Sequence, residues 1–202
     1  MLHIIGLNHK VQAKFPAADL DEAQQAFARR LRASIQEVNP VLIAEEHSEE
    51  VLKTLGKVSI AKEIAVQEQI RHRFCDPEAE QRRVIGYKKS SDIETEMSQK
   101  SRWDLPDEQR GIVARAIEIG RYFPKREQFW LECLDAGLCR SAAVVFACGD
   151  VHIESGSFTK LLNDHEVPYK IVERRLGVDE DQRYYSALAH LQQHPEVLDA
   201  PF

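Results

Sequence analysis

The chain has 202 residues, of which 30% are charged, and its formal net charge at pH 7 is −6. This length suits one domain that buries a full core, with room for a small helical insertion. The acidic balance argues against nucleic acid as a bulk electrostatic partner. Because the sequence has no run of about 18 apolar residues and no basic, cleavable N-terminal leader, we expect neither a membrane span nor a signal peptide.

The four cysteines lie in or beside apolar stretches and show no CxxC spacing; they are Cys75, Cys133, Cys139 and Cys148. Such a distribution favours buried, reduced thiols over disulfides or a zinc knuckle. Reduced thiols persist in the cytosol, so we expect a cytoplasmic protein.

The N-terminal apolar run His3 to Leu7 is a predicted strand, and it overlaps the motif Gly6-Leu7-Asn8-His9. A helix follows, capped by Asp19 and running to about Glu37, with apolar residues at helical spacing. The next predicted strand, 41–44, ends in Glu45-Glu46-His47. A strand, helix, strand unit of this length implies right-handed parallel pairing, so Glu45 and Glu46 should leave the sheet at the same edge as His9.

Residues 48 to 136 are predicted to form a largely helical insertion or cap within a single domain of residues 1–202. Short helices are expected near 49–55 and 60–70, and 72–75 is a candidate short strand closed by Asp76-Pro77. The charged, Ser-rich segment 87–102 is typical of a mobile segment or lid. Two longer helices should cover 104–122 and 125–136, and the second has Pro124 at its start.

Residues 142–148 form a continuous apolar run that is typical of a strand covered on both faces. It leads into Gly149-Asp150-Val151-His152, which repeats the GxxH pattern of residues 6–9. A helix near 157–163, a strand near 168–172 and a helix near 181–193 follow. This alternation predicts a three-layer α/β/α fold with a mostly parallel central sheet and the helical insertion.

Strand ends and helix starts would bring a set of polar side chains to one edge of this sheet, where open α/β folds place their sites. Two strand-end imidazoles suit a Zn, Mn or Co ion, with a carboxylate completing the sphere. We therefore predict His9, Glu45 and His152 as metal ligands, and Glu46, Arg126 and Asp150 as catalytic residues. Further candidates at this edge are Asn8, Asp76 and Glu127.

The order of these motifs resembles that of the TraB and Tiki group and, more distantly, of erythromycin esterases and haem-binding ChaN lipoproteins. The residues that carry the resemblance are Gly6 and His9, Glu45 in LIAEE, Arg126 in KREQFW, and Gly149 and His152 in CGDVH. The resemblance implies a three-layer α/β/α fold. For Tiki it implies metal-dependent peptide hydrolysis, and for the esterases metal-independent ring opening with a histidine as base. Tiki-type proteins are secreted or membrane-tethered, in contrast to our expectation for this chain.

Three functional hypotheses follow. The first is a cytosolic hydrolase of a peptide, amide or ester bond in which a divalent metal activates water and Arg126 steadies the oxyanion. The second keeps the same site without metal, with His9 or His152 as the general base. The third is a non-enzymatic module that binds a small ligand, haem or a protein. The expected partners are a small-molecule or peptide substrate, with no nucleic acid and no membrane, and a homodimer is the assembly to consider first.

Overall fold

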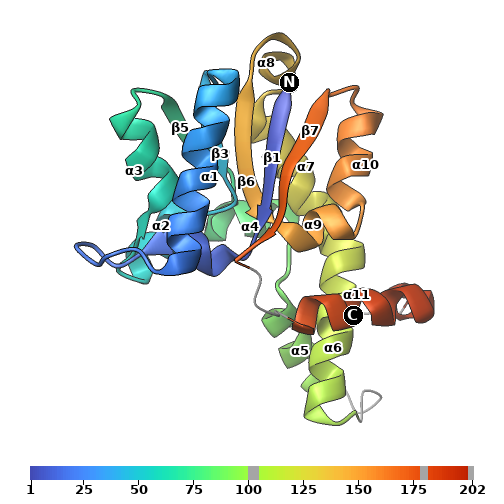
Figure 1. The fold of residues 1–202 in the computed structure, drawn as a ribbon. Coiled ribbons are helices and arrows are strands. Elements are labelled where there is room, and N and C mark those ends of the chain that lie inside the picture. Colours follow the sequence, from blue (N-terminus) through green and yellow to red (C-terminus); the bar gives the residue numbers. More distant parts are fainter. Residues whose placement is uncertain (100–104, 178–181, 200–202) are drawn as a thin grey trace.

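A five-stranded sheet organises the computed structural model, which describes residues 1–99, 105–177 and 182–199. The strand order is β5-β3-β6-β1-β7, and all neighbouring pairs are parallel (Figure 1). The strands are β1 (Leu2–Leu7), β3 (Leu42–Glu45), β5 (Arg71–Phe74), β6 (Val144–Gly149) and β7 (Tyr169–Leu176).

Both faces of this sheet are covered by helices. On one face, alternate strand residues such as Ile5 and Ile43 pack against α1 (Glu22–Val38) and α3 (Ile60–Gln67). On the other, residues such as Ile4 and Phe146 pack against the helices α7 (Phe123–Leu134), α8 (Ala136–Ser141) and α10 (Ser157–Asp164). Burial on both faces explains why these strands read as continuous apolar runs. The predicted three-layer α/β/α fold is confirmed.

The three strands predicted from apolar runs are neighbours, because β6 lies between β3 and β1. Their carboxyl ends are level: Leu7 pairs with Gly149, and Glu45 pairs with Ala147. The helices that follow β1 and β3 cover one face, whereas α10, which follows β6, covers the other. When the connections from neighbouring strands pass to opposite faces of the sheet, a crevice forms between the carboxyl ends of those strands. Open α/β sheets bind ligands in this crevice.

Beyond this carboxyl edge lies a helical extension, formed by α5 (Ser90–Ser98), α6 (Asp107–Ile117) and α11 (Gln182–Gln193), at the lower end of the molecule in Figure 1. Ile93 and Met97 of α5 pack against α6, and Ala187 of α11 belongs to a second small cluster with α6. The segment predicted as a lid is thus a packed helix over 90–98, while its residues 100–102 lie outside the described part of the chain.

The remaining elements are short. They are the 3-10 helices η1 (His9–Gln12) and η4 (Pro195–Asp199), the strands β2 (Ala13–Lys14) and β4 (Val58–Ser59), and the helices α2 (Glu49–Thr54), α4 (Ala79–Ile85) and α9 (Asp150–Glu154). The predicted helical insertion therefore contains β4, which pairs with β2, and β5, which forms one edge of the main sheet.

Two predicted boundaries differ from the structure. The first long helix is capped by Asp21 and not by Asp19, because Asp21 and Gln24 form a reciprocal capping box. The chain also does not break at Pro124: a π-helical turn, η3 (Glu118–Tyr122), joins α6 directly to α7, and Pro124 lies just after that turn, at the start of α7. Among the described residues, no helix is long and apolar enough to cross a bilayer.

Candidate functional site

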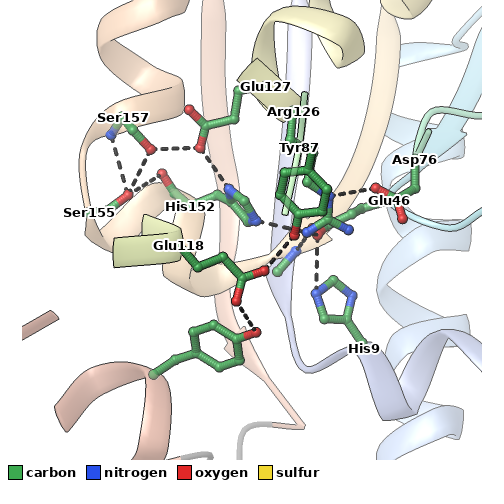
Figure 2. A network of polar contacts seen from close by, with 12 residues as sticks. His9, Glu46, Asp76, Tyr87, Glu118, Arg126, Glu127, His152, Ser155 and Ser157 are labelled. Atoms are coloured by element: carbon green, nitrogen blue, oxygen red, sulfur yellow. Dashed lines mark hydrogen bonds and ion pairs between the residues drawn. The ribbon is translucent and has the colours of Figure 1, made fainter. Parts of the chain in front are cut away.

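One buried carboxylate, that of Glu46, lies at the centre of the carboxyl edge (Figure 2). Its Oε1 is 2.7 Å from Arg126 Nη1 and 3.3 Å from the Nε2 atoms of both His9 and His152. Its Oε2 accepts a hydrogen bond of 2.6 Å from the backbone N–H of Gly149. Burial by itself would raise the pKa of Glu46, but Arg126, His9 and His152 together hold it well below its ordinary value. Glu46 is therefore a buried anion held between cations and donors.

Arg126, in the first turn of α7, bridges Glu46 to a second carboxylate. Its Nε donates to Asp76 Oδ1 at 2.5 Å, and Asp76 follows β5 at the same sheet edge. The guanidinium also lies over the rings of Tyr87 and Trp130, 5.5 and 5.1 Å from their centroids. Two carboxylates on different nitrogens of a planar group fix its orientation, as a lysine could not.

His152 lies in the short helix α9 and is fully buried. Its Nδ1 donates to Glu127 Oε1 at 2.6 Å, and that oxygen also accepts a hydrogen bond from Ser157. The imidazole stacks on Phe123, with 3.8 Å between the ring centroids. Burial would lower the pKa of His152, but the Glu46 carboxylate and the hydrogen bond to Glu127 raise it to about 9. His152 is thus held as a fixed imidazolium at neutral pH.

His9 is the accessible member of the cluster, with 44% of its side chain exposed. Its Nδ1 is 3.4 Å from Gln12 Nε2, a long contact, while its Nε2 faces Glu46. Asn8 does not reach Glu46; it accepts a hydrogen bond of 3.0 Å from Lys10 N and so caps the turn that carries His9. Of the two imidazoles, His9 is the one that solvent or a ligand can reach.

The glycine of each GxxH motif leaves space for a polar side chain of the other motif. A Cβ on Gly149 would lie 2.7 Å from His9 Nε2, and a Cβ on Gly6 would lie 2.4 Å from Asp150 Oδ1. Contacts this short would force one of the side chains to move. Each glycine therefore permits the close approach of a polar side chain from the other motif, which gives the repeated pattern a physical reason.

Two residues predicted for this site point elsewhere. Glu45 is one residue before Glu46 and therefore faces the other side of the sheet, where it binds His72 at 2.8 Å and accepts a hydrogen bond from Ser59. The Asp150 carboxylate turns towards β7 and α11, where it accepts hydrogen bonds from Arg174, the Arg175 backbone and Tyr185. Glu46 occupies the place between the two histidines that we predicted for Glu45.

Two cavities flank the cluster and share His9, Arg126 and Tyr184. A narrow one of about 70 Å³ is lined mainly by apolar and aromatic groups, including Phe123 and Val151. A wider one of about 290 Å³ opens towards α4 and α5 and is lined mostly by polar side chains. A ligand can therefore reach the histidine and the arginine from two chemically different sides.

Several residues of the site carry no motif in the sequence. Tyr87 donates a hydrogen bond to Glu118, a buried carboxylate in the π-helical turn (Figure 2). The Tyr184 hydroxyl and the backbone N–H of Ser90 donate to the same carboxylate. His47 lines the wider cavity with its ring centroid 6.1 Å from that of His9. For His47, the signal in the sequence was its place in the run of polar residues directly after strand β3.

The predicted metal can be tested against these donors. His9, Glu46 and His152 are ligand types that Zn, Mn or Co accept. However, Arg126 already lies 2.7 Å from the shared Glu46 oxygen, and His152 has the high pKa of an imidazolium. In the described parts of the chain, no group of three or more His, Cys, Asp or Glu residues is arranged to hold a metal ion. A metal ion held by these residues would therefore have to displace Arg126 from the shared Glu46 oxygen.

Comparisons with known proteins give no further guide: no family model, no curated protein and no solved structure matches this chain. The class of the molecule therefore rests on its fold and on the Glu46 cluster.

Proposed function

We propose that the carboxyl edge of the sheet is the active site of a hydrolase that acts on an ester, lactone, amide or peptide bond. The observation that supports this most directly is one buried carboxylate, Glu46, contacted by an accessible imidazole, a buried imidazolium and a guanidinium. A base beside fixed cations is what attack of water on a carbonyl requires. The resemblance of the two GxxH motifs to hydrolase families agrees with this.

In this proposal His9 is the general base. Its Nε2 faces Glu46, so Nδ1, whose contact with Gln12 is long, is the nitrogen that takes the proton from water. Water then attacks the carbonyl carbon, and Glu46 stabilises the imidazolium that forms. Arg126 stabilises the negative charge on the carbonyl oxygen, and the buried His152 imidazolium adds positive charge on the far side of Glu46. The bond between the carbonyl carbon and the leaving group then breaks, and the proton on His9 passes to the leaving group. Asp76 and Glu127 are positioning residues for these two cations.

The metal-dependent version is the second candidate, and one observation favours it. A carboxylate that binds the far nitrogen of a histidine, as Glu127 binds His152 Nδ1, is common behind metal-ligating histidines. A divalent ion held by His9, Glu46 and His152 would polarise the carbonyl and lower the pKa of a bound water.

A panel of ester, lactone and peptide substrates tests the proposal. We expect His9→Gln to lower turnover by roughly 10²-fold or more, while His165→Gln, at an exposed histidine after α10, leaves it unchanged. Absence of turnover on every substrate would leave the binding module as the better hypothesis.

Elemental analysis of protein purified without chelator or histidine tag separates the two hydrolase versions. We expect far less than one metal ion per chain and turnover that EDTA does not change. One ion per chain, with turnover lost in EDTA and restored by Zn or Mn, would establish the metal version. We further propose that the protein is cytoplasmic, which its four unpaired cysteines support.

A further inference from the structure

The wider cavity beside the Glu46 cluster is lined by two cations that the proposed chemistry does not use. Arg82 comes from α4, and Lys89 is the N-cap residue of α5. Arg82 is half-buried and Lys89 is exposed at the opening. Both face the same space as His9 and Arg126.

In the part of the chain that the structure describes, neither of these cations has a carboxylate partner. Within residues 1–99, 105–177 and 182–199, no ion pair involves Arg82 or Lys89, whereas their neighbours Arg83 and Lys88 pair with Glu80 and Glu96. Lys89 also has a pKa below its ordinary value, first because the cavity wall partly desolvates its charged form and then because of the nearby charge of Arg82. The two side chains therefore place unpaired positive charge on one wall of the cavity.

The carboxylates in the same cavity are all engaged. Glu46 and Asp76 bind Arg126. Glu118 accepts hydrogen bonds from the hydroxyls of Tyr87 and Tyr184 and from a backbone N–H. These contacts hold the negative groups in place and leave Arg82 and Lys89 available to a ligand.

We infer that the substrate of the proposed hydrolase carries an anionic group, a carboxylate or a phosphate, which Arg82 and Lys89 bind in the wider cavity. That the bound molecule is a substrate rests on the proposed function, whereas the anion site itself is inferred from the geometry of the cavity. Charged hydrogen bonds to an anion would orient the scissile carbonyl towards His9 and Arg126. The narrow cavity, with Phe123 and Val151, would take an apolar part of the same molecule.

The test uses two chromogenic esters of equal length, 4-nitrophenyl hexanoate and the mono-4-nitrophenyl ester of adipic acid. We expect the double variant Arg82→Gln, Lys89→Gln to lower kcat/KM for the adipate ester at least about tenfold more than for the hexanoate ester. The matched control, Arg83→Gln with Lys88→Gln, removes the same charge one residue away and should leave the ratio of the two esters unchanged. A ratio that stays constant in the first variant, or falls equally in the control, overturns the inference.

Calorimetric titration with adipate and with hexyl phosphate keeps the anion site testable if neither ester is hydrolysed. We expect the wild-type chain to bind at least one of these ligands, with the tighter one identifying the group, and the Arg82, Lys89 double variant to bind it at least about tenfold more weakly. Binding without hydrolysis would contradict the proposed function and support the anion site. No binding of either ligand, or equal binding by both proteins, would contradict the anion site itself.

Discussion

At the scale of single residues, the site depends on which of two adjacent glutamates reaches the carboxyl edge. Glu45 and Glu46 are both buried, yet they face opposite sides of the sheet because successive strand residues alternate. Glu46 meets Arg126 and the two histidines, whereas Glu45 meets His72 and Ser59. A one-residue difference thus separates a carboxylate of the site from a buried structural one.

Arg126→Lys tests the role of the guanidinium. Because Arg126 uses different nitrogens for Glu46 and Asp76, an ammonium cannot keep both contacts. We expect the free energy of unfolding to fall by about 2 kcal/mol, which corresponds to roughly 4–8 °C in melting temperature for a chain of this size. Turnover per folded molecule should fall by roughly 10²-fold.

Thermal melts and initial rates on one preparation measure both effects, with Arg83→Lys, at an exposed arginine, as the control. Unchanged stability with unchanged turnover would show that Arg126 has neither a structural nor a catalytic role.

The raised pKa of His152 predicts how stability depends on pH. Below the ordinary value of 6.5, the imidazole is protonated in both folded and unfolded chains, so its contribution is fully present. As pH rises towards about 9, the unfolded chain loses this proton while the folded chain keeps it, and the contribution is lost. We expect the free energy of unfolding to fall by roughly 3 kcal/mol across this interval.

Urea unfolding between about pH 6 and about pH 9.5 measures this slope. Glu127→Gln keeps a hydrogen-bond acceptor for His152 Nδ1 but removes the charge, so the slope should be shallower in that variant. Identical slopes in the two proteins would mean that Glu127 does not hold the proton on His152.

At the scale of elements, Asp150 connects the end of β6 to β7 and α11. Its carboxylate accepts hydrogen bonds from Arg174 at 2.7 and 2.9 Å and from Tyr185 at 2.9 Å. Burial would raise the pKa of Asp150, but these contacts lower it. The sequence motif predicted Asp150 as a catalytic residue, whereas these contacts favour a structural role.

Asp150→Asn decides between the two roles. Since Arg174 is partly exposed, we expect a loss of about 1–3 kcal/mol in the free energy of unfolding, with little change in turnover per folded molecule. Asp164→Asn, at an exposed carboxylate that pairs with Lys160, should alter neither quantity. A loss of turnover without any loss of stability would instead restore Asp150 as a catalytic residue.

At the scale of the whole molecule, the thiols report on the integrity of the core. Cys75, Cys139 and Cys148 are buried, and Cys133 is half-buried. Hydrogen bonding between the Cys75 and Cys133 thiols lowers the pKa of Cys133, and burial raises that of Cys148. We expect a thiol reagent to modify Cys133 first and the other three only on unfolding.

Titration of denatured, non-reduced protein should count all four thiols, and mass spectrometry of the native protein should locate the first one modified. A native disulfide would contradict both the unpaired state of the cysteines and the proposed cytoplasmic location.

The sequence by itself determined the sheet and the edge at which the site lies. Apolar runs at 2–7, 41–45 and 142–148 predict parallel, doubly covered strands, because only burial on both faces tolerates continuous apolar residues. Strand ends and helix starts predict that a set of polar residues converges there, since parallel strands end at one edge. Glu45 and Asp150 belong to that predicted set but point elsewhere, which leaves His9, Glu46, Arg126 and His152. These four residues do meet in the structure.

The tertiary structure alone decided how the polar side chains are partnered. Which glutamate faces α7 depends on where β3 ends relative to the pleat. Asp150 turns away from the site because it binds Arg174 and Tyr185, which come from later segments of the chain. The cavity with Arg82 and Lys89 exists because α4 and α5 pack below the edge. Such contacts join segments far apart in the chain, and local periodicity, which reports each segment's own burial, contains no information about them.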